Sequence, residues 1–117
     1  MPSMSFVPGW SWTRSLVGLG ATTNALDPGL YTSLLIQGNG FTINGITGGE
    51  ANRVLIITEG SAGGSTFAHN SGSASAANRM ILQLAGSVTL AQWHSMILIY
   101  NATDALWYQL GQRSVLV

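Results

Sequence analysis

The sequence predicts an all-β protein: an antiparallel β-sandwich or barrel-like domain of about eight short strands that follows an extended N-terminal arm. Two observations lead to this prediction. From position 31 onward, runs rich in β-branched and aromatic residues alternate with turn residues, which leaves little room for a helix. The first thirty residues instead combine prolines, glycines and tryptophans with no sustained period of 2 or 3.6. We therefore divide the chain into an arm at 1–30 and a β-sandwich domain at 31–117.

The first half of the predicted domain contains three strands, at 31–36, 41–46 and 53–58. Gly38-Asn39-Gly40 contains Asn-Gly, the strongest short hairpin signal, and predicts a hairpin between the first two strands. In the third strand Val54 and Ile56 fall on one face, and Leu55 and Ile57 on the other. Both faces of this strand are therefore expected to be covered, as in a central strand.

The second half begins with a long loop of small residues at 61–78 around a short strand at 65–69, and continues with strands at 79–84, 87–90, 93–100 and 105–110. The strand at 93–100 is apolar on both faces: Trp93, Ile97 and Ile99 share one, and Met96, Leu98 and Tyr100 share the other. A single sandwich leaves one of these faces in water, so a second sheet or another subunit is expected to cover it.

The composition points to a protein that assembles. Only 7% of the residues are charged, against about 25% in typical soluble domains. The chain has no lysine and a formal net charge of zero, so little charge repulsion keeps copies apart. Apolar strands with two faces need partner surfaces, and closed cyclic symmetry supplies them without open-ended growth. We expect a homotrimer.

Several classes of partner are disfavoured. Four basic and four acidic residues give no basic face for nucleic acid and no polybasic run for a membrane surface. The absence of cysteine removes disulfides and soft metal ligands. The apolar arm is too hydrophobic for a disordered tail and is expected to lie against another surface. We predict no partner nucleic acid, no membrane, no metal and no cofactor.

The sequence offers little that resembles a catalytic site. His69 or His94 could pair with Ser71 or Ser95 and an acid such as Asp104 or Glu59, but no Gly-x-Ser-x-Gly motif is present. The four carboxylates lie far apart along the chain, unlike the close acid pair of a glycosidase. We interpret His69 as a hydrogen-bonding residue at a turn or strand end and His94 as a structural residue. The prediction is a protein without catalytic residues, not an enzyme.

One series of residues carries a resemblance. The run His69 to Arg79, His-Asn-Ser-Gly-Ser-Ala-Ser-Ala-Ala-Asn-Arg, precedes Gly-Ser-Val-Thr-Leu at 86–90, Ser-Met-Ile-Leu-Ile-Tyr at 95–100 and Trp107. It resembles a bacteriophage virion β-module of the kind found in tail-fibre and capsid decoration proteins. The resemblance covers about half of the chain and implies a structural part. Where the module usually has Gly-Asp, this chain has Trp93-His94, an apolar choice that favours burial against partners.

Two hypotheses for the function stay open. The first is a trimeric capsid decoration (cement) protein at the virion surface, made in the host cytoplasm, whose partners are its own copies and the major capsid protein. The short chain, which begins at Met1 and ends soon after its last strand, favours a complete small gene product of this kind. The second is a short tail-fibre or receptor-binding module whose aromatic residues contact host surface sugars.

Three groups of residues are assigned to contacts. Arm residues expected to contact the capsid or a subunit are Phe6, Val7, Trp10, Trp12 and Leu16. Residues expected in the trimer interface or core are Trp93, Met96, Ile97, Leu98, Tyr100 and Trp107. Expected loop contacts are His69, Asn70, Asn78 and Arg79, with Arg79 capping exposed carbonyls or bridging to another subunit.

Overall fold

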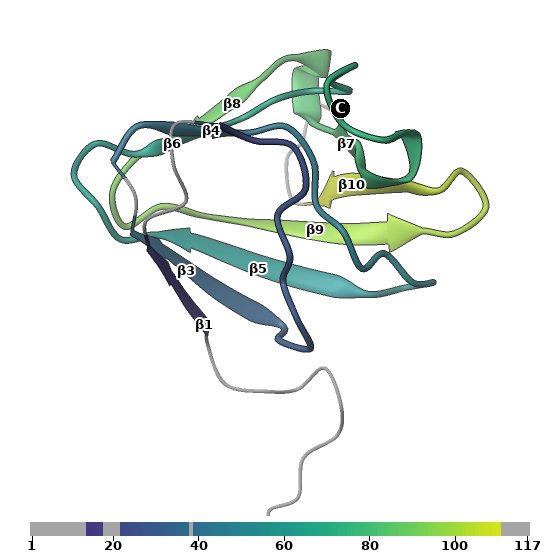
Figure 1. Cartoon of the computed structure of the whole chain (residues 1–117), viewed down its shortest axis with the longest axis horizontal. Coiled ribbons are helices and arrows are strands. Elements are labelled where there is room, and N and C mark those ends of the chain that lie inside the picture. The colour runs from purple at the N-terminus through teal and green to yellow at the C-terminus, as the bar shows by residue number, and fades with distance from the viewer. Residues whose placement is uncertain (1–13, 18–21, 38, 111–117) are drawn as a thin grey trace, which may run out of the picture.

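The computed structural model describes residues 14–17, 22–37 and 39–110 (Figure 1). Its strands are β1 (Arg14–Val17), β2 (Thr22–Thr23), β3 (Ser33–Gln37), β4 (Phe41–Ile43), β5 (Val54–Glu59), β6 (Ser65–Phe67), β7 (Met80–Ile81), β8 (Val88–Leu90), β9 (Ser95–Asn101) and β10 (Leu106–Leu110). Two short 3₁₀ turns, η1 (Ala76–Asn78) and η2 (Gln83–Ala85), flank β7. The all-β prediction is confirmed for these residues.

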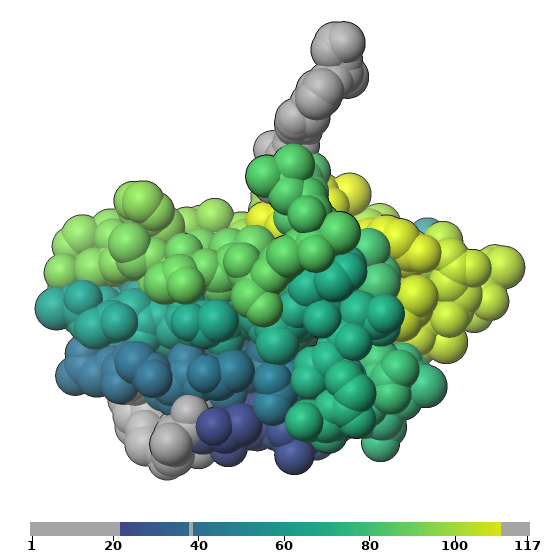
Figure 2. Space-filling model, turned by 90° about the horizontal axis from the view of Figure 1, so that it is seen from above, coloured from purple at the N-terminus to yellow at the C-terminus, as the bar shows by residue number. Residues whose placement is uncertain are grey.

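The strands form two sheets that pack face to face. One sheet has six strands in the order β1-β3-β5-β9-β10-β7, and the other has four in the order β2-β4-β6-β8. Figure 1 shows β3, β5 and β9 in one layer and β4, β6 and β8 in the other. From above, the strands β8, β6 and β4 run as neighbouring stripes across one surface of the molecule (Figure 2).

Both sheets are mixed, which corrects the expectation of an antiparallel sandwich. The chain passes alternately from one sheet to the other, so β1, β3 and β5 pair in parallel, and so do β2, β4 and β6. These strands form three successive coils, as in a β-solenoid. Strand β8 then pairs antiparallel with β6, and β9 pairs antiparallel with β5, with β10 and β7 lying beyond β9 in the six-stranded sheet. The segment around Asn39 and Gly40 therefore joins β3 to β4 across the two layers and does not close a hairpin.

The core lies between the layers, and the period of 2 along each strand explains its membership. Alternate side chains of β3, β5 and β9 point inward and are buried, while their neighbours point away from the core. The four-stranded sheet supplies Phe41, Ile43, Phe67 and Leu90, and the six-stranded sheet supplies Leu34, Ile36, Leu55, Ile57, Met80, Met96, Leu98, Tyr100 and Trp107.

The described part of the predicted arm lies within this domain. Strand β1 forms one edge of the six-stranded sheet and β2 one edge of the four-stranded sheet. Leu26 is buried in the core and Pro28 is also buried. The arm residues Phe6, Val7, Trp10 and Trp12 lie outside the described residues, and Leu16 belongs to β1.

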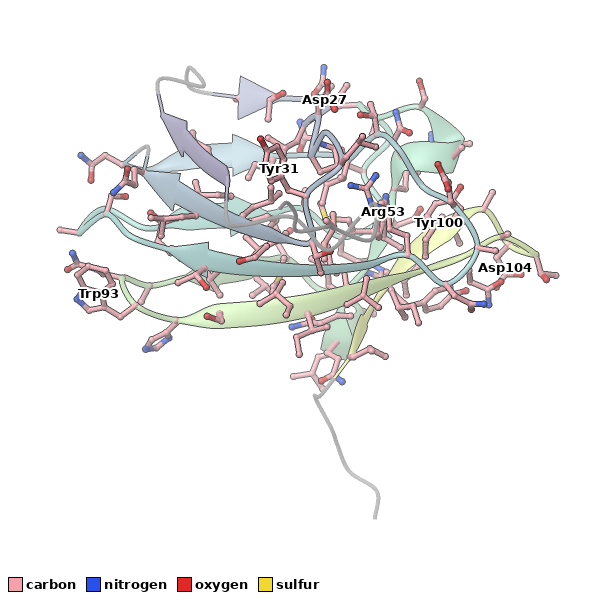
Figure 3. The ribbon with its side chains drawn as sticks, turned by 90° about the horizontal axis from the view of Figure 1, so that it is seen from below. Asp27, Tyr31, Arg53, Trp93, Tyr100 and Asp104 are labelled. Atoms are coloured by element: carbon pink, nitrogen blue, oxygen red, sulfur yellow. The ribbon has the colours of Figure 1, made fainter. Side chains whose placement is uncertain are left out.

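The Arg53 side chain, just before β5, forms hydrogen bonds to the loops that precede β3 and β5. Its guanidinium donates to the carbonyl oxygens of Gly48 at 2.9 Å, Gly29 at 2.6 Å and Tyr31 at 3.1 Å. Figure 3 shows Arg53 between Tyr31 and Tyr100. Because several loop carbonyls share this one cation, the loops before β3 and β5 hold a fixed arrangement.

Gly49 packs directly on the aromatic ring of Tyr100. A Cβ at this position would lie 2.1 Å from Cε1 of that ring, so no side chain fits without displacing it. We expect Gly49→Ala to lower the free energy of unfolding by about 1 to 3 kcal/mol, as overpacking does. Chemical denaturation measures the change. Gly72→Ala is the matched control, because a Cβ there has no atom within 4 Å, and equal losses in the two variants would contradict the packing argument.

Candidate assembly surface

The outer face of the six-stranded sheet carries an apolar patch. On β5, β9 and β10 the residues that point away from the core pair directly across the sheet: Val54 with Ile99, Ile56 with Ile97, Tyr108 with Ile99, and Leu110 with Ile97. We call these six residues, Val54, Ile56, Ile97, Ile99, Tyr108 and Leu110, the outer patch. The central strand β9 is thus apolar on both faces, as the sequence indicated.

Three large apolar side chains of the outer patch are exposed to solvent. Ile56 and Ile97 are each 38% exposed and Leu110 is 43% exposed, while Val54, Ile99 and Tyr108 are half-buried. None of the six is charged, and one border is formed by a hydroxyl pair in which Thr58 Oγ1 and Ser95 Oγ lie 2.7 Å apart. A contiguous apolar area with a polar border is typical of a protein interaction site.

A pocket of about 570 Å³ opens at one end of the outer patch. It lies between the turn before β5 and the turn that joins β9 to β10, and it shares Ile99 and Tyr108 with the patch. The other lining residues are Ala51, Asn52, Tyr100, Asn101, Ala102, Thr103 and Asp104. We call it the end pocket. Its volume lies within the range of about 300 to 1,000 Å³ that suits a ligand or a large side chain.

The β9–β10 turn gives the end pocket a fixed shape. The side-chain oxygen of Asn101 accepts hydrogen bonds from the backbone N–H groups of Thr103 at 2.9 Å and Asp104 at 3.4 Å. The Tyr108 hydroxyl donates to Asp104 Oδ2 at 2.6 Å. This hydrogen bond to the carboxylate raises the pKa of the Tyr108 phenol, since it stabilises the protonated hydroxyl.

Trp93 lies at the opposite end of the molecule from Asp104 (Figure 3). The sequence placed it inside a strand, but β9 begins at Ser95 and Trp93 occupies a tight turn in which the His94 N–H donates to the Ala91 carbonyl. Its side chain is 70% exposed and its φ is +70°. Trp93 is therefore not part of the core of this chain.

The other residues assigned to the interface or core divide between the two faces of the sheet. Met96, Leu98, Tyr100 and Trp107 are buried in the core, and Ile97 lies on the outer patch. Ile56, Tyr108 and Leu110 were not among the contact residues predicted from the sequence. The alternation of residues along 54–58 and 106–110 is the signal that places them beside Ile97.

The predicted loop contacts at 69–79 form hydrogen bonds within this chain, both inside the loop and to neighbouring segments. His69 Nδ1 accepts a hydrogen bond from the Leu82 N–H at 3.0 Å, in agreement with a strand-end role. Arg79 Nε donates to the Ala74 carbonyl at 3.1 Å, within its own loop. The Asn78 carbonyl accepts from the Ile46 N–H, and the Asn70 N–H donates to the Met80 carbonyl.

Two of the candidate catalytic groups, Glu59 and His94, have different surroundings in the structure. Glu59 is fully buried, and its carboxylate accepts hydrogen bonds from the backbone N–H and hydroxyl of Ser61 and from the hydroxyl of Ser65. His94 is exposed in the turn after Trp93. Within the described ranges, no group of three or more histidine and acidic residues could hold a metal ion, and no helix is long and apolar enough to cross a membrane.

Comparisons with known proteins give a likeness of fold. No family model matches the chain, and neither does any curated protein. A solved structure described as that of a chaperone–substrate complex contains a chain of similar fold, with a TM-score of 0.54 over 92% of this chain at 14% sequence identity. This chain spans 18% of the length of that chain. At this identity the likeness shows the fold alone.

Proposed function

We propose that this protein is a structural subunit of a bacteriophage particle: a homotrimeric capsid decoration (cement) protein that binds the major capsid protein and stabilises the head shell, and that has no catalytic role. The observation that carries the assembly part of this proposal is the outer patch. Its uncharged, partly exposed residues continue across three strands, and burying such an area against another copy is favourable by roughly 25 cal/mol per Å² of apolar surface.

The low charge of the chain supports the same proposal. A protein with 7% charged residues and no net charge has few groups that would have to be desolvated at a subunit contact. The virion setting rests on the resemblance of 69–107 to phage virion modules. The head as the site of binding rests on the apolar, tryptophan-rich composition of residues 1–13, which suits contact with a shell.

A tail-fibre or receptor-binding module is the second candidate. The observation that favours it is the end pocket, where a tyrosine ring lies beside amide, hydroxyl and carboxylate groups. Aromatic rings and such polar groups are the usual partners of sugars. Binding of a host surface saccharide that Tyr108→Ala removes, together with a position at the tail on intact particles, would favour this candidate over the first.

We expect Ile97→Asp to convert the trimer into monomers, because each subunit contact would bury a carboxylate against an apolar surface. Sedimentation velocity on both proteins at matched concentrations measures the change. Thr89→Asp is the matched control, since Thr89 is exposed on the four-stranded sheet, away from the outer patch. A trimer that tolerates Ile97→Asp as well as it tolerates Thr89→Asp would rule out the outer patch as the contact.

Binding to the head is tested separately. Full-length protein and a variant that lacks residues 1–13 are mixed with undecorated heads, and the bound copies are counted. The proposal expects high occupancy by the full-length protein and a sharp loss for the variant, because a trimer loses three attachments at once. If the full-length protein does not bind heads, the capsid decoration proposal is wrong and the tail-fibre module becomes the favoured function.

A further inference from the structure

The outer patch is too small to hold copies of this chain together by itself. It has six residues, and three of them, Ile56, Ile97 and Leu110, are exposed. A stable protein–protein interface has about 20 to 30 residues a side and buries about 800 Å² on each partner. Contact between two bare patches falls short of this size, so the proposed trimer needs further apolar surface from elsewhere in the chain.

Residues 1–13 have the composition of such a surface. They contain no charged side chain, and their large apolar side chains are Met1, Met4, Phe6, Val7, Trp10 and Trp12. The outer patch is also without charge. Two uncharged surfaces meet without the cost of desolvating ions, and the apolar area that they bury contributes about 25 cal/mol per Å². These thirteen residues and the six of the patch together approach the size of a stable interface.

The register of the six-stranded sheet places the start of β1 level with the exposed side chains of the patch. Arg14, the first residue of β1, is in register with Leu34 on β3 and through it with Ile57 on β5. The adjacent row across the sheet, one residue earlier in β3 and β5, contains Ser33, Ile56, Ile97 and Leu110. Figure 1 shows β1, β3 and β5 side by side. Residues 1–13 thus join the sheet beside the row that holds the three exposed side chains.

The segment has the length to cross to a neighbouring copy. Strand β1 lies two strand spacings from β5 and four from β10, or roughly 10 to 19 Å, whereas thirteen residues can extend over about 43 to 47 Å. A segment that lay on its own patch would leave no apolar face for the other copies. We propose that residues 1–13 of one copy lie across the outer patch of the next, with Trp10 and Trp12 on its exposed side chains. The inference rests on the proposed trimer and names what covers the patch.

The chemistry of the patch fits these two tryptophans. Trp10 and Trp12 are two residues apart, so both side chains of an extended segment project to the same side. A tryptophan buried at an interface needs an acceptor for its ring N–H. The hydroxyl groups of Thr58 and Ser95 at the border of the patch supply acceptors, because each hydroxyl oxygen has two lone pairs and the bond between them uses one of the four.

The test uses full-length chains without heads, so that contact with a shell plays no part. Trp10→Ala combined with Trp12→Ala is expected to raise the concentration at which the trimer is half dissociated by at least about 30-fold, as for loss of an interface hot spot. Trp93→Ala is the matched control: Trp93 is 70% exposed and belongs to neither residues 1–13 nor the patch, so its trimer is expected to be unchanged. Sedimentation equilibrium measures all three proteins.

A mixture of two variants shows whether the segment crosses to another copy. The double tryptophan variant keeps its patch, and Ile97→Asp keeps its residues 1–13. At a concentration where each variant alone is a monomer, the mixture is expected to form a one-to-one dimer, because one intact segment then meets one intact patch. A segment that lies on its own chain would leave the mixture monomeric, and this result would overturn the proposal.

The possible failures are distinct. A wild-type chain that stays monomeric overturns the proposed trimer and this contact with it. A wild-type trimer that persists without Trp10 and Trp12 overturns the contact alone, and so does a loss of association in Trp93→Ala as large as in the double variant. A wild-type dimer that the double variant dissociates, and that re-forms in the mixture, overturns the proposed trimer and supports the contact.

Discussion

Replacing Trp107 by alanine is expected to lower the free energy of unfolding by about 3 to 5 kcal/mol, the range for truncating a large buried aromatic residue. Trp107 is fully buried in β10, and its ring meets that of Tyr100 edge to face at 5.1 Å between centroids. Its indole N–H donates to the Ile46 carbonyl at 2.9 Å. The variant thus creates a cavity and leaves a buried carbonyl without this donor.

Chemical denaturation at a concentration where the chain is monomeric measures this loss. Trp93→Ala is the matched control, because it makes the same truncation at a side chain that is 70% exposed, and its cost to the monomer is expected to stay below about 1 kcal/mol. Equal destabilisation by the two substitutions would show that the core does not depend on Trp107 as described.

Glu59→Ala is expected to cost about 2 to 4 kcal/mol, because buried hydrogen-bond donors lose their acceptor. The carboxylate joins the two sheets: Glu59 ends β5 in one, and Ser65, which is buried and donates to it, begins β6 in the other. Ser61 in the connecting turn donates to it twice. The Glu59 carbonyl also accepts a hydrogen bond from the Trp93 N–H, and this backbone contact is retained in the variant, so the expected loss comes from the side chain alone.

The control for Glu59 is Glu50→Ala, since Glu50 is exposed. Its effect on the unfolding free energy is expected within about 0.5 kcal/mol. Glu59→Gln is expected to cost less than Glu59→Ala because it keeps the shape and one acceptor oxygen. If Glu59→Ala were as stable as Glu50→Ala, the carboxylate would have no structural role between the sheets.

The strands from 33 to 110 could be predicted because their alternation of apolar and polar residues is a local property. The sequence placed β5 at 53–58 and the structure has Val54–Glu59; it placed β10 at 105–110 and the structure has Leu106–Leu110. Strands β1 and β2 were missed because each is at most four residues long and lies among glycines and prolines.

The sequence patterns did not show which strands pair with each other. Asn39-Gly40 suits a hairpin, but the same turn residues also suit a connection between two layers, and only packing decides between them. Trp93 was assigned to a strand because it falls on the same face as Ile97 and Ile99 in an alternating pattern, and the turn there lacks the glycine that normally marks a positive φ. The end pocket arises from two turns about fifty residues apart in the chain, so no local pattern reveals it.

The two faces of β5 and β9 were the most informative sequence feature. Val54 and Ile56 were placed opposite Leu55 and Ile57, and the structure buries the second pair while it leaves the first on the outer patch. This pattern led from sequence to the expectation of a covering subunit. The structure adds the residues of β10 that complete the surface.

The central claim, that this chain assembles through its outer face into a closed trimer, is tested most directly by the mass of the full-length protein in solution. Sedimentation equilibrium at micromolar concentration is expected to give a single species of three times the 12.3 kDa of the chain. A folded, soluble monomer under the same conditions would contradict the account, because the outer patch would then be stable in water without a partner.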